Sequence, residues 1–321
     1  MSKVSVLMPI YNTDLEHLKE AIDSVLSQTF RDFEFLILND SPNNTGLDDF
    51  VNAIQDERIK YFKNEQNIGI TPSRNKLIEL AQSEYLMVMD HDDISLPNRI
   101  EKQVAHLDAN PKVGVVGCFV KNLIGGKITY YPTNSDDIEE NLMFSCSISH
   151  SGCMIRKDVL IKNNIRYEEV FSPAEDYSLF CRLIRKTKFY NIPDVLFLYR
   201  NHAGNTTHRQ KEKMDRATFL IYEMVRSEQK DIWKKVLNKG CVVSRIKILG
   251  IPVFRLKKRG IQAEKEIEKF NQANLSSKNK FVFKLFNLLP IMTFYVKGKK
   301  TSGRLFGFLP VFESKYKFSI K

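Results

Sequence analysis

Short apolar runs that alternate with helix-patterned segments are the feature that most constrains the fold of this chain. The pattern predicts strands at Val4–Met8, Phe33–Leu38, Ile59–Phe62 and Tyr85–Met89, and helices between them at Leu15–Leu26, Leu47–Ile54 and Thr71–Ala81. This alternation is typical of βαβ units, which build a mostly parallel sheet. Because open α/β sheets bind ligands at the carboxyl ends of their strands, we expect a site there.

The second half of the chain has a more mixed pattern. It predicts strands at Val113–Val116, Ile148–Ile155 and Val195–Tyr199, a turn at Gly125-Gly126, and helices at Asp136–Met143, Ser172–Lys186 and His208–Leu237. Ser172 and Glu175 have the spacing of a capping box at the start of the helix Ser172–Lys186, just as Thr71 and Pro72 resemble an N-cap followed by proline at the first helical position.

Charge is distributed unevenly along the 321 residues. Residues 231–321 carry 21 Lys and Arg against 5 Asp and Glu, whereas residues 1–230 carry 28 against 33. The overall excess of positive charge therefore lies in the C-terminal part. We expect a globular domain at 1–230, followed by a basic, aromatic-rich extension at 231–321.

The five cysteines include no C-x-x-C pair, so we expect reduced thiols that pack in the interior. A C-x3-H-x2-C run at Cys146, His150 and Cys153 could hint at zinc, but no further ligand pair follows at suitable spacing. The N-terminal residues lack the long apolar region of a signal peptide, and we therefore expect no export.

Three carboxylates gather where the strand Tyr85–Met89 ends, at Asp90, Asp92 and Asp93. Carboxylates packed together repel one another, and a cation between them removes that conflict. An Asp-x-Asp at a strand end points both side chains to one side, and hard cations such as Mg²⁺ or Mn²⁺ prefer oxygen ligands. A solvated acidic loop that caps the following helix would have the same spacing.

The surroundings of the acidic cluster resemble the family 2 inverting glycosyltransferases, which have the GT-A fold. The resemblance covers about the first 210 residues, and its stretches are "VSVLMPIYN" (4–12), "FEFLILNDSP" (33–42), "NIGITPSRNKLIELAQSEYLMVMDHDDISLPNRIEKQ" (67–103), "AEDYSLFCRL" (174–183) and "YRNHAGNTT" (199–207). It implies a GT-A fold, with a Rossmann-like, mostly parallel sheet in a nucleotide-sugar half (1–117) and a mixed acceptor half (118–230). It also implies a nucleotide-sugar donor, usually a UDP-sugar, bound with Mn²⁺ or Mg²⁺.

Carried over residue by residue, the resemblance places the donor against residues from several loops. Tyr11 would offer its ring as a stacking face, Asp40 would accept the uracil N3 proton, and the Arg74 fork would suit a phosphate. The full set of implied nucleotide contacts is Pro9, Tyr11, Asn12, Asp40, Asn67, Gly69, Arg74, Asn75 and Asp90. A turn residue in the case of Asp40, or a surface ion pair in the case of Arg74, would need no ligand.

The same resemblance assigns the metal and the base. Asp92 would be the stronger metal ligand, with Asp90 nearer the ribose and His202 as a supplementary ligand. Inverting transfer needs a base for the acceptor hydroxyl, and Asp176 takes that position. Glu175 and His150 would line the acceptor side, although Glu175 could be only a capping residue.

Other classes of protein fit the sequence less well. A sugar nucleotidyltransferase would need a glycine-rich loop after the first strand, where this chain has Pro9-Ile10-Tyr11-Asn12. A processive synthase would need membrane spans, and "LFNLLPIMTFYV" (285–296) is shorter than the ~20 residues of a spanning helix. A non-enzymatic nucleic-acid binder would use the basic extension but leave the acidic motifs unexplained, so we expect no nucleic-acid partner.

Three apolar segments with a central proline recur in the extension: "ILGIPVF" (248–254), "FNLLPIMTF" (286–294) and "LFGFLPVF" (305–312). They could bind an anionic membrane together with the neighbouring basic residues, or form strands whose basic residues are solvated. The first alternative predicts a cytoplasmic enzyme held on the inner face of the membrane. The family resemblance implies a glycan or lipid-linked acceptor of a bacterial surface polysaccharide.

Overall fold

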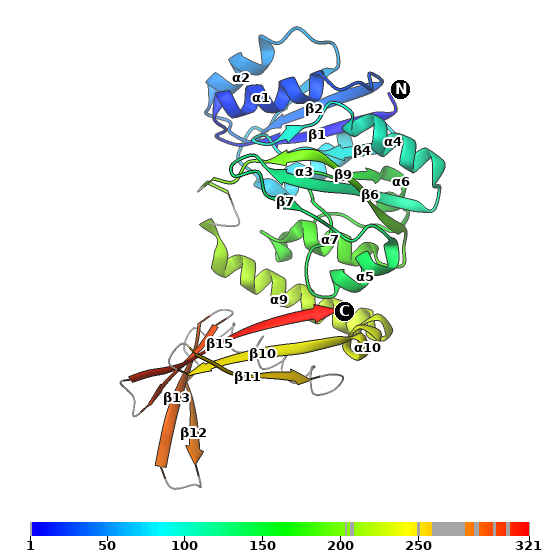
Figure 1. The fold of residues 1–321 in the computed structure, drawn as a ribbon. Coiled ribbons are helices and arrows are strands. Elements are labelled where there is room, and N and C mark those ends of the chain that lie inside the picture. The colour runs from blue at the N-terminus through cyan, green and yellow to red at the C-terminus, as the bar shows by residue number, and fades with distance from the viewer. Residues whose placement is uncertain are drawn as a thin grey trace. The chain divides into compact units, whose positions relative to one another are not determined.

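The computed structural model describes residues 2–202, 204–205, 209–248, 251–258, 280–285, 289–297, 300–305 and 309–320, with side chains up to Val236 apart from Lys211. The chain forms two compact units, Met1–Ile221 and Tyr222–Lys321 (Figure 1). Each unit is described by itself below.

The first unit contains strands and helices that alternate along its N-terminal half. The strands are β1 (Val4–Ile10), β2 (Phe33–Asn39), β3 (Ile59–Lys63), β4 (Tyr85–Val88), β5 (Ile94–Ser95), β6 (Val113–Asn122), β7 (Ile128–Thr129), β8 (Met154–Arg156) and β9 (Lys188–Tyr199). The helices are α1 (Leu15–Leu26), α2 (Thr45–Asn52), α3 (Ile70–Leu80), α4 (Arg99–Ala109), α5 (Ser135–Leu142), α6 (Lys157–Lys162), the 3₁₀ turn η1 (Glu169–Phe171) and α7 (Glu175–Leu183).

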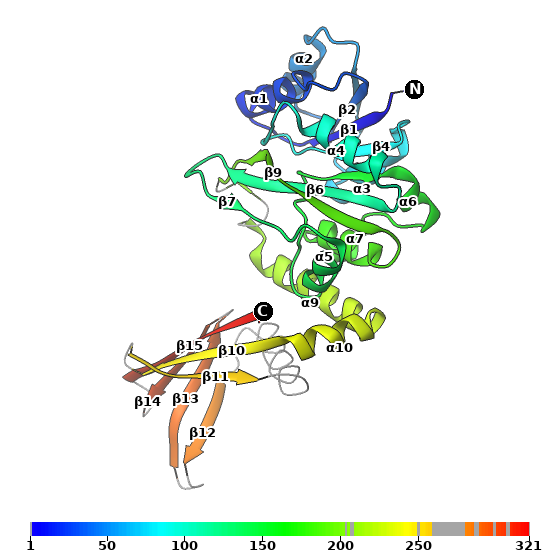
Figure 2. The same cartoon turned by 45° about the vertical axis from the view of Figure 1, so that its right-hand side comes forward.

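These strands form one sheet in the order β3-β2-β1-β4-β8-β6-β9-β5, with β7 beside β6. The pairs β2–β3, β1–β2 and β1–β4 are parallel, whereas β8 runs antiparallel to both β4 and β6. The long strands β6 and β9 lie side by side and are parallel, as Figure 2 shows. The expected fold class, an α/β sheet with a parallel first half and a mixed second half, is confirmed.

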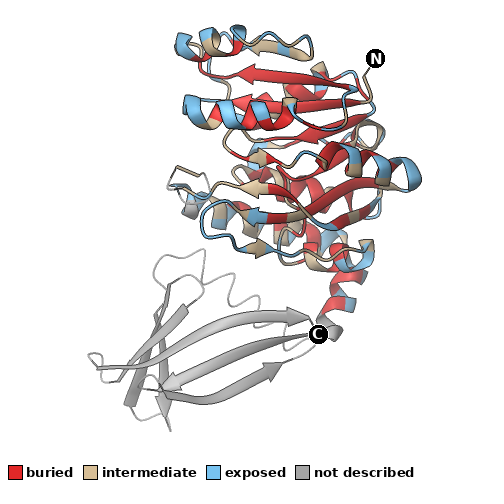
Figure 3. Ribbon diagram, turned by 45° about the horizontal axis from the view of Figure 1, so that its top comes forward, coloured by how far each residue is buried: buried red, intermediate tan, exposed pale blue. Residues whose placement is uncertain are grey.

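The core lies between this sheet and the helices. Leu18, Ile22 and Val25 recur at helical spacing on α1 and are fully buried in the same cluster as the side chains of β1 and β2. Figure 3 shows most of the central strands of this unit coloured as buried and the outer faces of the helices as exposed. This packing fixes the strand ends, and therefore the loops that carry the predicted site.

Several predicted element boundaries are wrong, among them the starts of α3, α7 and β8. Helix α3 begins at Ile70 after Gly69 rather than after Thr71, so Pro72 lies inside the first turn, where its missing N–H costs no helical hydrogen bond. Helix α7 begins at Glu175 with Ala174 as N-cap, and no side chain caps it. The predicted strand Ile148–Ile155 shortens to β8, because the preceding residues form turns.

A further helix, α9 (Lys211–Glu228), crosses the boundary between the units, and α10 (Lys230–Lys239) follows it. The pattern predicted a single helix there, and that prediction is wrong. The described residues include no helix with the length and apolarity needed to cross a bilayer.

The second unit continues as an antiparallel sheet in the order β11-β10-β15-β14-β13-β12. Its strands are β10 (Gly240–Ile248), β11 (Ile251–Lys258), β12 (Lys280–Leu285), β13 (Leu289–Lys297), β14 (Lys300–Leu305) and β15 (Leu309–Ile320). Each proline segment opens the second strand of a hairpin, and the register shifts next to Pro252, Pro290 and Pro310 alike. Proline cannot donate to the ladder, which favours an irregularity at these points.

Candidate active site

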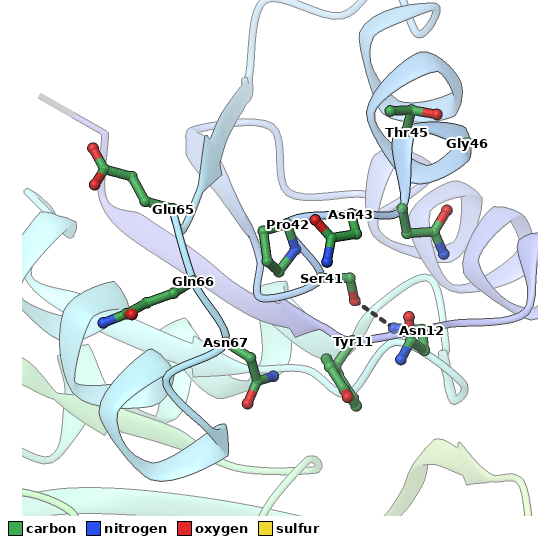
Figure 4. A pocket seen from close by; sticks show the side chains of 11 residues that line it. Tyr11, Asn12, Ser41, Pro42, Asn43, Thr45, Gly46, Glu65, Gln66 and Asn67 are labelled. Carbon is green, nitrogen blue, oxygen red and sulfur yellow. Dashed lines mark hydrogen bonds between the residues drawn. The ribbon is translucent and has the colours of Figure 1, made fainter.

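The loops after β1, β2 and β3 enclose a cavity of about 750 Å³. Figure 4 shows Tyr11 and Asn12 from the first loop, Ser41–Thr45 from the second and Glu65–Asn67 from the third. The Tyr11 ring is 53% exposed, so it is free to stack on a planar ligand. Asn12 has a positive φ of 45°, and its N–H donates to the Ser41 hydroxyl at 2.7 Å, which ties the first loop to the second.

Pro9, by contrast, does not line this cavity. It lies inside β1, which continues to Ile10, and it is buried beside its register partner Leu38. Strand β1 pairs with β4 only as far as Leu7, so a proline at this point leaves no ladder hydrogen bond unmade on that side. The expectation that Pro9 ends the strand is wrong.

Asp40 is the buried centre of the donor-side loops. One carboxylate oxygen, Oδ1, accepts from Asn64 Nδ2 at 2.8 Å and from the Ile68 N–H at 2.9 Å. The other, Oδ2, accepts from Asn67 Nδ2 at 3.1 Å and from the Gly69 N–H at 2.9 Å. A carboxylate offers about four acceptor positions, so these donors occupy all of them.

Gly69 makes this arrangement possible because its φ is +90°, a conformation that costs other residues free energy. The resulting turn directs the free N–H groups before α3 toward Asp40. Asp40 therefore organises the loop that carries Asn67 and Gly69, and the uracil contact expected for it stays a prediction that would compete with these hydrogen bonds.

Arg74 joins the donor side to the opposite half of the sheet. It lies in the first half of α3, with Nη2 at 3.4 Å from Asp90 Oδ1 and Nη1 at 2.6 Å from Glu175 Oε1. Its guanidinium lies over the Tyr167 ring, 5.7 Å from the centroid. A surface ion pair was the alternative for Arg74, but its side chain is only 14% exposed.

Asp90 follows β4, and two side chains contact its carboxylate. Ser151 donates to its Oδ2, and Arg74 approaches its Oδ1. Burial alone would raise the pKa of Asp90, but the charge of Arg74 and the hydrogen bond from Ser151 outweigh burial and lower it. Asp90 therefore stays ionised at the end of the strand.

Asp92 pairs with His202, the residue expected to supplement metal binding. The His202 Nε2 lies 2.9 Å from Asp92 Oδ2, and the Gly204 N–H donates to His202 Nδ1 at 3.1 Å. With Nδ1 accepting, Nε2 carries the proton and donates to Asp92. The structure thus brings together two predicted residues that lie far apart in the sequence.

Two further residues lie near Asp92: Asp93, which the sequence placed in the acidic cluster without a role of its own, and Arg200, which sequence reasoning missed. Asp93 is buried, accepts from the Arg200 N–H at 2.7 Å, and leaves its Oδ2 without a partner among the described residues. Burial, followed by the charges of Asp90 and Asp92, raises the pKa of Asp93 well above its usual value. Arg200 also donates through Nε to the Asp92 carbonyl at 2.8 Å and contacts Glu20. The run of acidic residues marked Asp93, but no local pattern marked Arg200.

The chemistry of this donor set fits a hard divalent cation. The described residues contain no group of three or more metal-ligating side chains, so a cation here would take Asp92 and His202 plus oxygens from a ligand. Magnesium and manganese accept such a set, because they use one or two carboxylates together with substrate phosphates. Asp93 Oδ2 has no partner among the described residues, and burial beside Asp90 and Asp92 raises the pKa of Asp93, so a cation would relieve the crowding of these carboxyl groups.

Asp176 lies in the first turn of α7, and the Tyr177 N–H donates to its Oδ1 at 2.7 Å. Burial, reinforced by the neighbouring charge of Glu175, raises its pKa to about 6. Glu175 does not cap the helix, as the capping-box spacing suggested; instead its carboxylate is only 3% exposed and binds Arg74. The capping interpretation of Glu175 is wrong because Arg74 holds its carboxylate.

His150 and Asn75 support Tyr167, the ring beneath Arg74. His150 Nε2 lies 2.8 Å from the Tyr167 hydroxyl, and burial lowers the pKa of His150 to about 3, so it is neutral. The Asn75 side chain bonds the Tyr167 backbone twice, at 2.9 Å to the carbonyl and 3.0 Å from the N–H. Both polar atoms of Asn75 are used in this way. The donor contact expected for Asn75 and the acceptor contact expected for His150 stay predictions.

The four cysteines whose side chains the structure describes belong to no group of three or more metal-ligating side chains. Cys118, Cys153 and Cys181 are buried free thiols, and Cys146 is also free. Cys146 donates to the Ile148 carbonyl while His150 binds Tyr167, so the C-x3-H-x2-C run uses its polar atoms separately.

Comparison with known proteins agrees with this fold. The family model described as glycosyl transferase family 2 matches residues 5–192. An uncharacterized glycosyltransferase of Methanocaldococcus jannaschii is 31% identical over 226 residues, which are 66% of this chain and 76% of the relative. Glycosyltransferase GlyG of Streptococcus pneumoniae is 29% identical over 223 residues, 63% of this chain and 72% of the relative.

Solved structures extend the likeness to the fold. The structure of S. aureus TarS 1-349 in complex with UDP-GlcNAc superposes with a TM-score of 0.61 at 20% identity, over 74% of this chain and 72% of that one. A mannosyltransferase from Pyrobaculum calidifontis in complex with GDP-Man and Mn²⁺ superposes with a TM-score of 0.54 at 15% identity, over 71% and 65%. The chain therefore belongs to glycosyl transferase family 2, and it is a glycosyltransferase with the GT-A fold.

Proposed function

We propose that this enzyme transfers a sugar from a UDP-sugar to a hydroxyl group of its acceptor with inversion at the anomeric carbon. The observation that carries the proposal is Asp176, a half-buried carboxylate whose pKa is raised to about 6. A general base works best when its pKa lies close to the working pH, because it is then both ionised and able to take a proton.

The donor would occupy the cavity beside Tyr11, with the uracil on the exposed ring and the loop organised by Asp40 around it. Neutral amides line this cavity, among them Asn12, Asn43 and Asn67, and such groups suit the polar edge of a base. TarS and the archaeal mannosyltransferase bind UDP-GlcNAc and GDP-Man respectively, which supports a nucleotide-sugar donor here.

Asp92 and His202 would hold a divalent cation, Mn²⁺ or Mg²⁺, with Asp90 nearer the ribose. To ligate through Nε2, His202 would have to give up the proton that now points at Asp92. Such a cation supplies Lewis-acid stabilisation of the diphosphate leaving group. The binding of Mn²⁺ beside GDP-Man in the mannosyltransferase supports this assignment.

In the reaction, Asp176 takes the proton of the acceptor hydroxyl while that oxygen attacks the anomeric carbon. The bond between the anomeric carbon and the diphosphate oxygen breaks at the same time, through an oxocarbenium-like state. Proton and electron pair are thereby accounted for: the proton goes to Asp176 and the electron pair to the diphosphate.

The acceptor we propose is a glycan or lipid-linked acceptor of a bacterial surface polysaccharide, such as lipopolysaccharide, lipooligosaccharide or capsule. This rests on the family resemblance and on the basic extension, which carries 21 Lys and Arg in residues 231–321. Each basic residue near an anionic membrane contributes about 1 kcal/mol of binding, so the extension would hold the enzyme on the inner face of the membrane.

A panel of nucleotide sugars with Mn²⁺, scored for slow donor hydrolysis without acceptor, tests the proposed function. Hydrolysis of one UDP-sugar that depends on the metal and is lost in Asp176→Asn is the expected result. No hydrolysis and no calorimetric binding of UDP with Mn²⁺ would exclude the UDP-sugar assignment.

A further inference from the structure

Arg74 and Glu175 form a buried ion pair whose position suggests more than a structural role. Their side chains are 14% and 3% exposed, and Nη1 and Oε1 lie 2.6 Å apart. The second oxygen of Glu175, Oε2, is buried without a hydrogen-bond partner among the described residues. Buried ion pairs of this kind add little net stability, since the cost of desolvating both charges offsets their attraction.

The pair joins the two halves of the site through one guanidinium. Arg74 comes from α3, next to the donor-side loop; Glu175 opens α7 on the acceptor side; and the other nitrogen of the fork approaches Asp90 after β4. Glu175 is adjacent to Asp176 in the first turn of α7. The contact with Arg74 therefore links α3 to the first turn of α7, which carries Asp176.

We propose that Glu175 and Arg74 are positioning residues for Asp176: their ion pair holds the first turn of α7 in place and provides the charge environment in which Asp176 acts as base. This inference rests on the proposed function, because it takes Asp176 as the base. It assigns Glu175 a role in controlling the base, in addition to the acceptor-side location expected for it.

The groups around Asp176 support this role, because few of them carry a charge that could act on its carboxylate. Its electrostatic neighbours include Glu175 on the same helix, Arg74 from α3 and Asp90 after β4. Four more interact with it from other segments: Tyr131, Cys146, Cys153 and Tyr167.

Burial raises the pKa of each of these four thiol and phenol groups, to about 12 for Cys153, so they carry no charge near neutral pH. The charged neighbours are thus Glu175, Arg74 and Asp90. After burial itself, the charge of Glu175 has the largest influence on the pKa of Asp176 and raises it, whereas Arg74 lowers it. Removing Glu175 or Arg74 should therefore shift the titration of Asp176 in opposite directions.

The test is a carbon-13 NMR titration of the full-length protein labelled at the aspartate carboxyl carbon. Comparison with the spectrum of Asp176→Asn assigns the Asp176 signal. Glu175→Gln keeps the shape and an acceptor for Arg74 but removes the charge, so we expect the Asp176 midpoint to fall by about one pH unit or more. Arg74→Gln should raise the midpoint by a similar amount.

The matched control is Glu79→Gln, which removes an exposed carboxylate from the same helix as Arg74 and should leave the midpoint unchanged. If the ion pair were purely structural, the charge of Glu175 would not influence Asp176, and the Asp176 midpoint would be the same in Glu175→Gln as in wild type. An unchanged midpoint would therefore overturn the inference. If Arg74→Gln fails to fold by circular dichroism, Glu175→Gln alone decides, since its hydrogen bond is retained.

A separate measurement distinguishes this inference from the proposed function. Calorimetry of UDP with Mn²⁺ on the wild-type protein tests donor binding and does not involve Asp176 directly. If the Asp176 midpoint shifts as expected but UDP does not bind, the charge coupling is supported and the UDP-sugar proposal is refuted. If UDP binds but the midpoint does not shift, the UDP-sugar proposal is supported and the charge coupling is refuted.

Discussion

Replacing Asp176 with asparagine should make the protein more stable while nearly abolishing its activity. Burial and Glu175 raise the pKa of Asp176 from 3.8 to about 6 in the folded state. The folded protein therefore binds more protons than the unfolded chain between about pH 4 and pH 6, and its free energy of unfolding falls as the pH rises through that interval. Above that interval the ionised Asp176 destabilises the fold by a constant amount.

The size of this effect follows from the shift of about two units, which corresponds to roughly 3 kcal/mol at 1.36 kcal/mol per unit. Asp176 is partly exposed, so solvent screening reduces the figure, and we expect Asp176→Asn to gain about 1 to 3 kcal/mol at pH 8. Asparagine keeps an oxygen for the Tyr177 N–H, so the helix start is preserved. At pH 4 the gain should vanish, because wild-type Asp176 is then protonated and neutral as well.

Chemical denaturation of wild type and Asp176→Asn at pH 4 and pH 8 measures both values, and donor turnover at pH 8 measures the loss of activity. Turnover should fall by about 10² to 10⁴, the range for a positioned general base, with UDP affinity nearly unchanged. Wild-type activity should rise with pH through about 6 as Asp176 loses its proton. A mutant that is equally destabilised at both pH values, or that keeps more than a third of the wild-type rate, would contradict the reasoning.

Four further predictions address other parts of the molecule. Asp92→Ala should abolish the Mn²⁺-dependent part of UDP binding in calorimetry, whereas Asp194→Ala, a surface control that pairs with Lys102, should bind as wild type does. Gly69→Ala should destabilise the protein by about 1 kcal/mol, seen as a lower melting temperature, because its φ of +90° disfavours a side chain; nothing lies within 4 Å of the added Cβ, so no clash contributes. The control Gly46→Ala, inside α2, should be neutral or stabilising. Asp40→Asn should lose about 1 to 3 kcal/mol of stability, because the amide NH2 group replaces one of the two oxygens that accept hydrogen bonds and would face N–H donors. Chemical denaturation measures this loss, and an unchanged stability would contradict the importance of the four hydrogen bonds. Full-length protein should sediment with anionic liposomes at low salt and be released at high salt; equal sedimentation with neutral liposomes would refute electrostatic membrane binding.

The parts of the fold that could be predicted depend on local patterns. Strand β2 was expected at Phe33–Leu38 and is found at Phe33–Asn39, because a short, mostly apolar run between helices is typical of a strand in an α/β protein. The start of α7 could not be predicted in the same way. The spacing of Ser172 and Glu175 matches a capping box, and only the distant Arg74 shows that the Glu175 carboxylate has another partner.

The residues of the candidate site likewise fall into those that the sequence could indicate and those known only from contacts between distant segments. Asp90 and Asp92 could be named because acidic residues at a strand end are visible in the sequence, and Asp176 because it matches the position of the base in the family that the chain resembles. Arg200 was missed since its importance lies in contacts with Asp92 and Asp93, more than a hundred residues earlier in the chain. A resemblance could name His202, but its partner became known only from the distance of 2.9 Å to Asp92.

Asp40 shows that a residue named from the sequence can have contacts that the sequence does not predict. Its position after β2 marked it as part of the donor site, and the structure does place it beneath the loop that carries Asn67 and Gly69. Yet sequence cannot count how many donors reach a carboxylate. Because the chain supplies four, a base that binds here would have to displace one of them or use a neighbouring amide. Specificity for the nucleobase would then depend on the loop that Asp40 holds in place, and a substitution that loosens Gly69 would change it as much as one at Asp40 itself.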